Sequence, residues 1–431
     1  MHFKYFVLGA TALFAQSLPV AAQIAAQPIP SQAVQQFAAV ESEPLTLEQA
    51  VAKTLATNPA LRATALDVAI AAGARRQAGL FPNPEVSFVR EGTQRGTRTQ
   101  TFQLSQPLEL FGKRSARIKL ADAERSLAVG NLNVARTDLR VDVTTAFFDA
   151  LAAQERVRLA QASLDVASKA TGAATKRVAA GRASPVEQDR AAVAEATSRN
   201  ELAGAQSELS IAMHGLTAYW GETGPVIREL VTPELDLAPT PALDEVQRRL
   251  DQSPQLRRAR LQVEREEAQV GVDRSQRMPN LTLIVGSKKD DQIGRSQTVL
   301  GLSAPLPLFN HNQGALQASL SRAEKARAEL EAERVRLHQG LASAHQRAQL
   351  SREQVRTMRE QILPTAQRVF DSTVTGFEAG KFGFLDVLDA QRTLLQIRTQ
   401  YLQALYDRYR AVAELGRYAG TGATQDNRIS P

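Results

Sequence analysis

Few residues in this chain have the types and spacing that catalytic or metal chemistry needs. The five histidines include His338 and His345, seven residues apart, which is about 10.5 Å along a helix axis and too far to chelate one metal ion. The chain has no cysteine and four methionines, so thiolate ligands and cysteine nucleophiles are absent. Its sequence contains neither a glycine-rich phosphate loop with lysine nor a Ser/His/Asp grouping. We therefore expect no enzyme activity, no cofactor and no resident metal site.

Charged residues gather instead after two glycines that interrupt long helical patterns. The first group is Gly181, Arg182 and Glu187, and the second is Gly380, Lys381, Asp386 and Asp389. Asp386 and Asp389 are three residues apart, which places both carboxylates on one helical face. The alternative for both groups is ordinary solvated charge at helix ends, because charged helical surfaces produce such pairs freely.

The chain contains two copies of one plan, over about 44–220 and 243–420. Phe81-Pro82-Asn83 aligns with Met278-Pro279-Asn280, and Ala180-Gly181-Arg182 aligns with Ala379-Gly380-Lys381. The offset of about 195–199 residues is far longer than the ~20–50 residues of a solenoid repeat. The pattern predicts a duplicated half-protein, each half with a helix, two short strands, a long helix and a return helix.

Each copy contains a very long helical pattern. Residues 113–183 contain no proline and repeat apolar residues at alternating spacings of four and three, a heptad seam that favours supercoiling. A helix of this length is about 100 Å long. In the second copy the seam extends over about 313–378 through Val355 and Ile362, and Pro364 predicts a kink. We expect the shorter helices over about 46–80, 185–215 and 384–418.

Each copy also has two short strands with one apolar face, over about 85–105 and 280–304. Apolar side chains alternate with polar or small ones, and polar turns at 92–97 and 287–294 join the strands. Strands of about nine residues with this alternation are typical of outer-membrane barrels. The residues expected to face lipid are Val86, Phe88, Phe102, Leu104, Leu281, Leu283, Val285, Leu300 and Leu302. The alternative is a pair of water-exposed hairpins, although two isolated hairpins are only marginally stable.

Four strands are too few to close a membrane barrel, since about eight is the minimum. Open strand edges are not tolerated in lipid. Several chains must therefore share one barrel, and three chains would supply twelve strands.

The remaining segments are the two ends of the chain and the stretch that joins its two halves. Residues 1–22 have a basic start, a short apolar core and small residues before Ala22, as in a signal peptide. Without cysteine, we expect no lipid anchor. The net charge of +7 is interspersed with acids along helices, so we expect no nucleic-acid binding. We expect a flexible lead-in over 23–43, a linker over 221–242 and a disordered tail over 421–431.

Two segments resemble a known family. Phe377–Gln391, which reads Phe-Glu-Ala-Gly-Lys-Phe-Gly-Phe-Leu-Asp-Val-Leu-Asp-Ala-Gln, closely fits the second tip motif of the TolC-like outer-membrane efflux family. Gln106–Arg114 is similar to the segment after the first hairpin in that family's cobalt–zinc–cadmium branch. The resemblance covers nearly all of the mature chain. It implies a mainly α fold with β: a trimeric α-helical barrel of long coiled-coil helices, plus a shared 12-stranded transmembrane β-barrel with four strands per internally duplicated chain.

The resemblance also implies a function and partners. It predicts a passive homotrimeric channel in the outer membrane of a Gram-negative bacterium, with a large periplasmic portion. The channel would be the exit duct of a tripartite efflux system that confers heavy-metal resistance. Its partners would be outer-membrane lipid, a periplasmic adaptor (membrane fusion protein) and an inner-membrane pump of RND type. Drugs or other small organics are the alternative cargo, and a non-channel periplasmic coiled-coil scaffold or adaptor is the alternative class.

The resemblance finally implies roles for the charged groups. Asp386 and Asp389 fall on the family's acidic constriction positions. The residues implied in tip gating and adaptor docking are Gly181, Arg182, Glu187, Gly380 and Lys381. The family commonly has a basic residue at the position of Phe382, so this chain departs from the pattern there, and no specific latch pair is implied.

Overall fold

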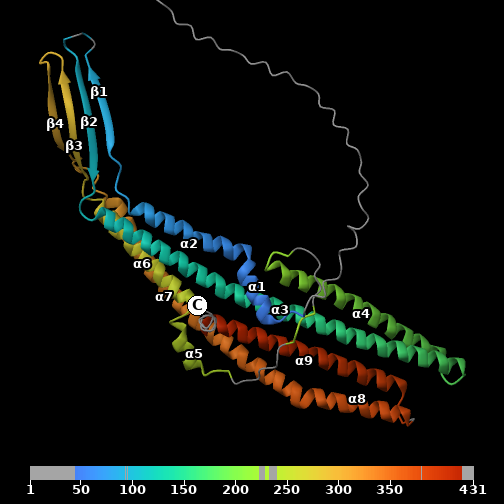
Figure 1. Cartoon of the computed structure of the whole chain (residues 1–431). Coiled ribbons are helices and arrows are strands. Elements are labelled where there is room, and N and C mark those ends of the chain that lie inside the picture. The colour runs from blue at the N-terminus through green and yellow to red at the C-terminus, as the bar shows by residue number, and fades with distance from the viewer. Residues whose placement is uncertain are drawn as a thin grey trace, which may run out of the picture. The chain divides into compact units, whose positions relative to one another are not determined.

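The computed structural model describes residues 44–92, 94, 96–222, 229–232, 240–379 and 381–419 (Figure 1). The expected signal peptide, the lead-in over 23–43 and the tail over 421–431 lie outside these residues. So do Gly380 and most of the expected linker over 221–242. Among the described residues, no helix is both long and apolar enough to cross a membrane.

The two halves have matching elements. The first half comprises α1 (Leu47–Thr57), α2 (Pro59–Ala78), β1 (Glu85–Glu91), β2 (Thr99–Leu108), α3 (Lys113–Ala179) and α4 (Pro185–Ala218). The second half comprises α5 (Leu243–Leu250), α6 (Pro254–Ser275), β3 (Leu281–Asp290), β4 (Arg295–Ser303), α7 (Gln313–Thr357), a π-helical turn (Met358–Ile362), α8 (Leu363–Glu378) and α9 (Phe384–Ala419).

The segment before the first strands, expected as one helix, is two. α1 ends at Thr57, and Asn58 caps α2 by accepting a hydrogen bond from the Leu61 N–H (2.8 Å). Pro59 has no N–H to donate back to α1, so it starts a new helix. Ser253 and Pro254 repeat the same break between α5 and α6.

The long helix α3 spans 67 residues and ends at Ala179, four residues before the expected end. Its heptad seam is buried or half-buried along its length, and Val143, Ala150 and Ala153 are at most 3% exposed. α3 packs against α2 and α6 in its first part and α4 in its second, and it also contacts α9 (Figure 1). The small seam residues allow these close helix contacts.

In the second long helix, the seam of apolar residues shifts at a π-helical turn. Pro364 has no N–H to donate to the carbonyl of residue 360, and Met358–Ile362 forms the π turn just before it. The wider turn changes the phase of the helix. Ile362, expected on the seam, is 38% exposed, whereas Ala366 is 8% exposed.

The four strands form one antiparallel sheet in the order β1-β2-β3-β4, with β2 paired to β3 across the two halves. The register places Val86, Leu104, Val285 and Leu300 opposite one another in one row. All nine residues expected to face lipid lie on this same side of the sheet. That this side contacts lipid stays a prediction. Within the described chain, β1 and β4 each pair along one edge only.

Aromatic side chains of α3 and α9 join the two halves. Phe148 stacks on Tyr409 with ring centroids 4.2 Å apart and lies 6.3 Å from the ring of Tyr406. Phe147 meets Phe148 edge-on at 5.7 Å. Phe147, Phe148 and Tyr406 are at most 2% exposed, so this cluster is the centre of the contact between the halves.

Ion pairs extend the contact between α3 and α9. Arg410 pairs with Asp149, and Arg417 pairs with Asp142 (3.2 Å) and Asp138 (3.4 Å). Burial raises the pKa of Asp138, and Arg417 opposes this shift. The desolvation cost therefore offsets part of the attraction between these charges.

We expect Phe148→Ala to lower the free energy of unfolding by about 3–5 kcal/mol, because it removes a buried ring and leaves a cavity. Denaturant titration of the purified protein would measure the loss. Phe148→Leu keeps apolar volume without the stacked ring and should cost clearly less. Equal losses for both variants would contradict a specific contribution of the stacking on Tyr409.

Candidate functional site

The turn between α3 and α4, which we call the first tip, is closed by a glycine-dependent cap. Gly181 has φ +69°, and its N–H donates to the Val178 carbonyl (2.9 Å). The Arg182 N–H donates to the Arg177 carbonyl (2.8 Å). These two bonds form a Schellman cap, which satisfies the last carbonyls of the helix. Ser184 then caps α4, so the chain reverses within a few residues.

We expect Gly181→Ala and Gly172→Ala to have opposite effects. Nothing lies within 4 Å of an added Cβ at either position, so only backbone conformation differs. Alanine at the left-handed position 181 should cost about 1–2 kcal/mol. Alanine at helical position 172 should stabilise α3 by about 0.5–1 kcal/mol. Amide hydrogen exchange in the last turns of α3 would measure both changes, and equal effects would refute the cap.

The charges of the first tip are paired within that tip. Arg177 donates to Glu187 (2.9 Å), joining the end of α3 to the start of α4. Among the described residues, the side chains of Arg182 and Lys381 make no hydrogen bond or ion pair. The partner of Glu187 within one chain is thus Arg177, which the sequence analysis did not single out. A latch through Arg182 or Lys381 stays a prediction.

The turn between α8 and α9, the second tip, closes in a similar way but carries an aromatic side chain. The Lys381 N–H donates to the Gly376 carbonyl (2.8 Å). The ring of Phe382 lies directly on Gly376, where an added Cβ would overlap it. Phe382 therefore packs against the end of α8, although it stays 49% exposed.

The two aspartates of the second tip have different surroundings. Asp386 accepts a hydrogen bond from the Gly383 N–H (2.7 Å), so its carboxylate stabilises the first turn of α9. Asp389 is exposed and has no hydrogen bond or ion pair among the described residues. Asp389 also lines a cavity of about 730 Å³ between α3, α4 and α9, together with Arg190, Glu201 and Arg392.

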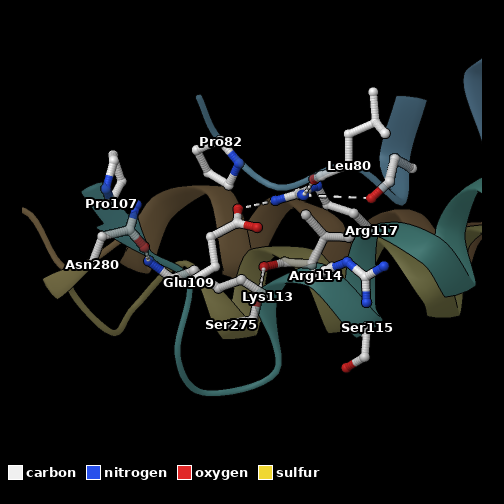
Figure 2. Close-up of polar contacts among 12 residues, drawn as sticks. Leu80, Pro82, Pro107, Glu109, Lys113, Arg114, Ser115, Arg117, Ser275 and Asn280 are labelled. Atoms are coloured by element: carbon white, nitrogen blue, oxygen red, sulfur yellow. Dashed lines mark hydrogen bonds and ion pairs between the residues drawn. The ribbon is translucent and has the colours of Figure 1, made fainter. Parts of the chain in front are cut away.

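At the opposite end of α3, a polar cluster joins the sheet to the helices (Figure 2). Arg117 pairs with Glu109 and donates to the Leu80 carbonyl (3.1 Å). Arg114 donates to the Gly79 carbonyl (2.8 Å). Two arginines of α3 thus satisfy carbonyl groups that the C-terminus of α2 leaves open.

The same cluster reaches the second half of the chain. Lys113 donates to the side-chain oxygen of Asn280, just before β3 (Figure 2). Burial lowers the pKa of Lys113, and Glu109 opposes this shift. Sequence reasoning noted the segment only for its resemblance. The four-residue spacing of Glu109, Lys113 and Arg117 was a signal for charge pairing, but the backbone partner of Arg117 at Leu80, just after α2, was not visible.

The family model described as outer membrane efflux protein matches residues 50–222 and again residues 246–421. The chain belongs to this family. Its members are outer-membrane efflux channels rather than a class of enzymes. The resemblance inferred from the tip motif is therefore confirmed.

Individual relatives agree with this assignment. The chain is 41% identical to the cobalt-zinc-cadmium resistance protein CzcC of Cupriavidus metallidurans, over 88% of the chain and 90% of the relative. It is 26% identical to the nickel-cobalt-cadmium resistance protein NccC of Alcaligenes xylosoxydans, over 68% of each. The crystal structure of the outer membrane protein VceC from Vibrio cholerae matches with a TM-score of 0.70 at 20% identity, covering 87% of this chain and 96% of VceC. The expected fold class is confirmed.

Proposed function

We propose that the chain is the outer-membrane channel of a tripartite heavy-metal efflux system and conducts its cargo passively to the exterior. The sheet carries the proposal, because one face presents nine apolar side chains while both outer strands have open edges. Open edges are stable in lipid only when further strands pair with them. Three copies would join twelve strands into one barrel, so the active form is a homotrimer.

The long helices continue from this barrel into the periplasm and form a tunnel. Their seams of small residues support side-by-side packing of helices from neighbouring copies. The two tips of each chain then lie at the periplasmic entrance. Three copies would bring six carboxylates from Asp386 and Asp389 to this entrance, where they favour cations over anions.

The tips also dock the partners. Arg182 and Lys381, whose side chains make no hydrogen bond or ion pair among the described residues of one chain, are available to a periplasmic adaptor. Gly181 allows the sharp reversal of the first tip, and Gly380 is the matching glycine in the sequence of the second half. The tips shift between closed and open states at these two positions. An inner-membrane pump of RND type, joined through the adaptor, supplies the energy.

Heavy-metal cations are the cargo that the relatives favour. The relative that is 41% identical over 88% of the chain is named for resistance to cobalt, zinc and cadmium. An acidic entrance suits such cations. Metal ions are cargo here and need no resident site: no group of three or more potential ligands is found among the described residues.

Two measurements test this proposal. Protein extracted from outer membranes should give discrete, cation-selective conductance steps in a planar bilayer as a trimer-sized particle. A strain that lacks the protein should regain resistance to zinc, cobalt and cadmium when the chain is restored. Recovery in the soluble periplasmic fraction without conductance would favour a scaffold. Conductance with resistance restored only to organic compounds would reassign the cargo.

A further inference from the structure

A collar of exposed apolar side chains surrounds the junction between the sheet and the helices. Its residues come from both halves and are each at least 56% exposed: Leu80, Phe81, Phe111, Leu306, Leu308 and Phe309. The collar residues flank the strand ends in the sequence, next to the row of the sheet that pairs Leu108 with Leu281. An exposed aromatic and aliphatic band next to a lipid-facing surface is typical of the membrane–water interface.

Cations without partners lie just beyond the collar on the helix side. Arg76 lies in the last turn of α2, four residues before Leu80. Arg274 lies in the last turn of α6, and Arg277 lies just after it. All three are exposed and make no hydrogen bond or ion pair through their side chains among the described residues. A headgroup layer occupies about 5–8 Å beyond the hydrocarbon, and one helical turn, the separation of Arg76 from Leu80 along the chain, is about 5.4 Å.

The nearby carboxylates are buried or paired and do not neutralise these cations. Glu109 pairs with Arg117, and its side chain is 8% exposed. Asp122 pairs with Arg75 (2.6 Å). Asp273 is 6% exposed. The exposed Glu85 lies on the opposite side of the sheet from Val86. From the sheet toward the helices, the exposed side chains of the junction are therefore first apolar and then basic.

The opposite end of the strands lacks this arrangement. Its turns mix basic and acidic side chains, as in Lys289-Asp290-Asp291 and Arg90-Glu91. A mixed end has no preference for anionic headgroups, whereas unpaired arginines beside an apolar band attract them. At the collar, Arg114 also lies 4.6 Å from the ring centre of Phe81, so a cation already covers one of the exposed rings.

We propose that the collar and Arg76, Arg274 and Arg277 bind anionic glycerophospholipid in the periplasmic leaflet of the outer membrane. The inference rests on the proposed function, because it needs the strands to span that membrane. The apolar collar inserts at the acyl boundary, and the three arginines contact the phosphate groups from the periplasmic side. Bound lipid then fixes the depth at which the sheet ends and the helices begin.

Native mass spectrometry of protein taken from mixed vesicles of phosphatidylglycerol and phosphatidylethanolamine tests the proposal. We expect phosphatidylglycerol to be retained about fivefold or more over its fraction in the vesicle, the effect of one arginine near an anionic surface. The variant Arg76→Gln/Arg274→Gln/Arg277→Gln should lose this enrichment and keep its conductance. The matched control Arg90→Gln/Lys289→Gln/Arg295→Gln removes the same charge at the hairpin turns and should keep the enrichment.

Each outcome has one meaning. Equal retention of the two lipids by the wild type, or unchanged enrichment in the collar variant, would overturn the lipid site. Loss of the enrichment in about 50 mM inorganic phosphate at constant ionic strength would also overturn it, because the arginines would then bind free phosphate as well as they bind the lipid. Protein that neither inserts nor conducts in any vesicle would instead refute the proposed function, which separates the two failures.

Discussion

Leu300→Lys should destabilise the folded protein in lipid by about 2–4 kcal/mol, the cost of a lysine near the middle of the lipid-facing side of a membrane strand. Leu300 is 75% exposed and lies in the row that crosses all four strands through Val285, Leu104 and Val86. Urea titration of protein folded into phospholipid vesicles would measure the loss. The amount of folded protein in outer membranes should fall with it.

The neighbouring residue provides a matched control. Val299 pairs with Gly286 on the opposite side of the sheet, which faces the channel interior in our proposal. Val299→Lys introduces the same charge one residue away and should change stability by less than about 1 kcal/mol, because interior positions of a barrel are hydrated. Similar losses for both variants would contradict the assignment of the two sides, and a larger loss for Val299→Lys would reverse it.

Asp386→Asn combined with Asp389→Asn should reduce the preference of the channel for cations by about fivefold. That factor corresponds to the ~1 kcal/mol attraction between unit charges about 4 Å apart in water. Reversal potentials across a potassium chloride gradient would measure it. Asp371→Asn, which changes an exposed carboxylate on α8, is the control and should leave selectivity unchanged.

The single variants separate two roles. Asp389 has no partner among the described residues, so Asp389→Asn should change selectivity without changing stability. Asp386 also accepts the Gly383 N–H, so Asp386→Asn should weaken the start of α9 by about 0.3–1 kcal/mol as well. Unchanged selectivity in the double variant would remove both residues from the constriction.

Some departures from expectation have local physical causes. The helix expected over 46–80 breaks because Asn58 caps α2 and Pro59 lacks an N–H. The seam expected through Ile362 shifts because Pro364 is preceded by a π-helical turn. Both prolines were visible in the sequence, but whether a proline kinks, ends or widens a helix depends on the contacts that the surrounding residues make. At the first break, the side-chain amide of Asn58 donates a hydrogen bond to the Tyr219 carbonyl (2.7 Å).

Sequence alone determined the features that depend on periodicity. The heptad seam of α3 and the alternation of the strands predicted the long helices and the hairpins, because burying one stripe or one face needs only a regular spacing of apolar residues. The tip motif Phe377–Gln391 then identified the family. Tertiary structure decided which distant groups meet. It paired β2 with β3, placed Phe148 on Tyr409 and brought Lys113 to Asn280. These contacts depend on how whole helices and strands pack together, and the spacing of residues along the chain does not reveal that packing.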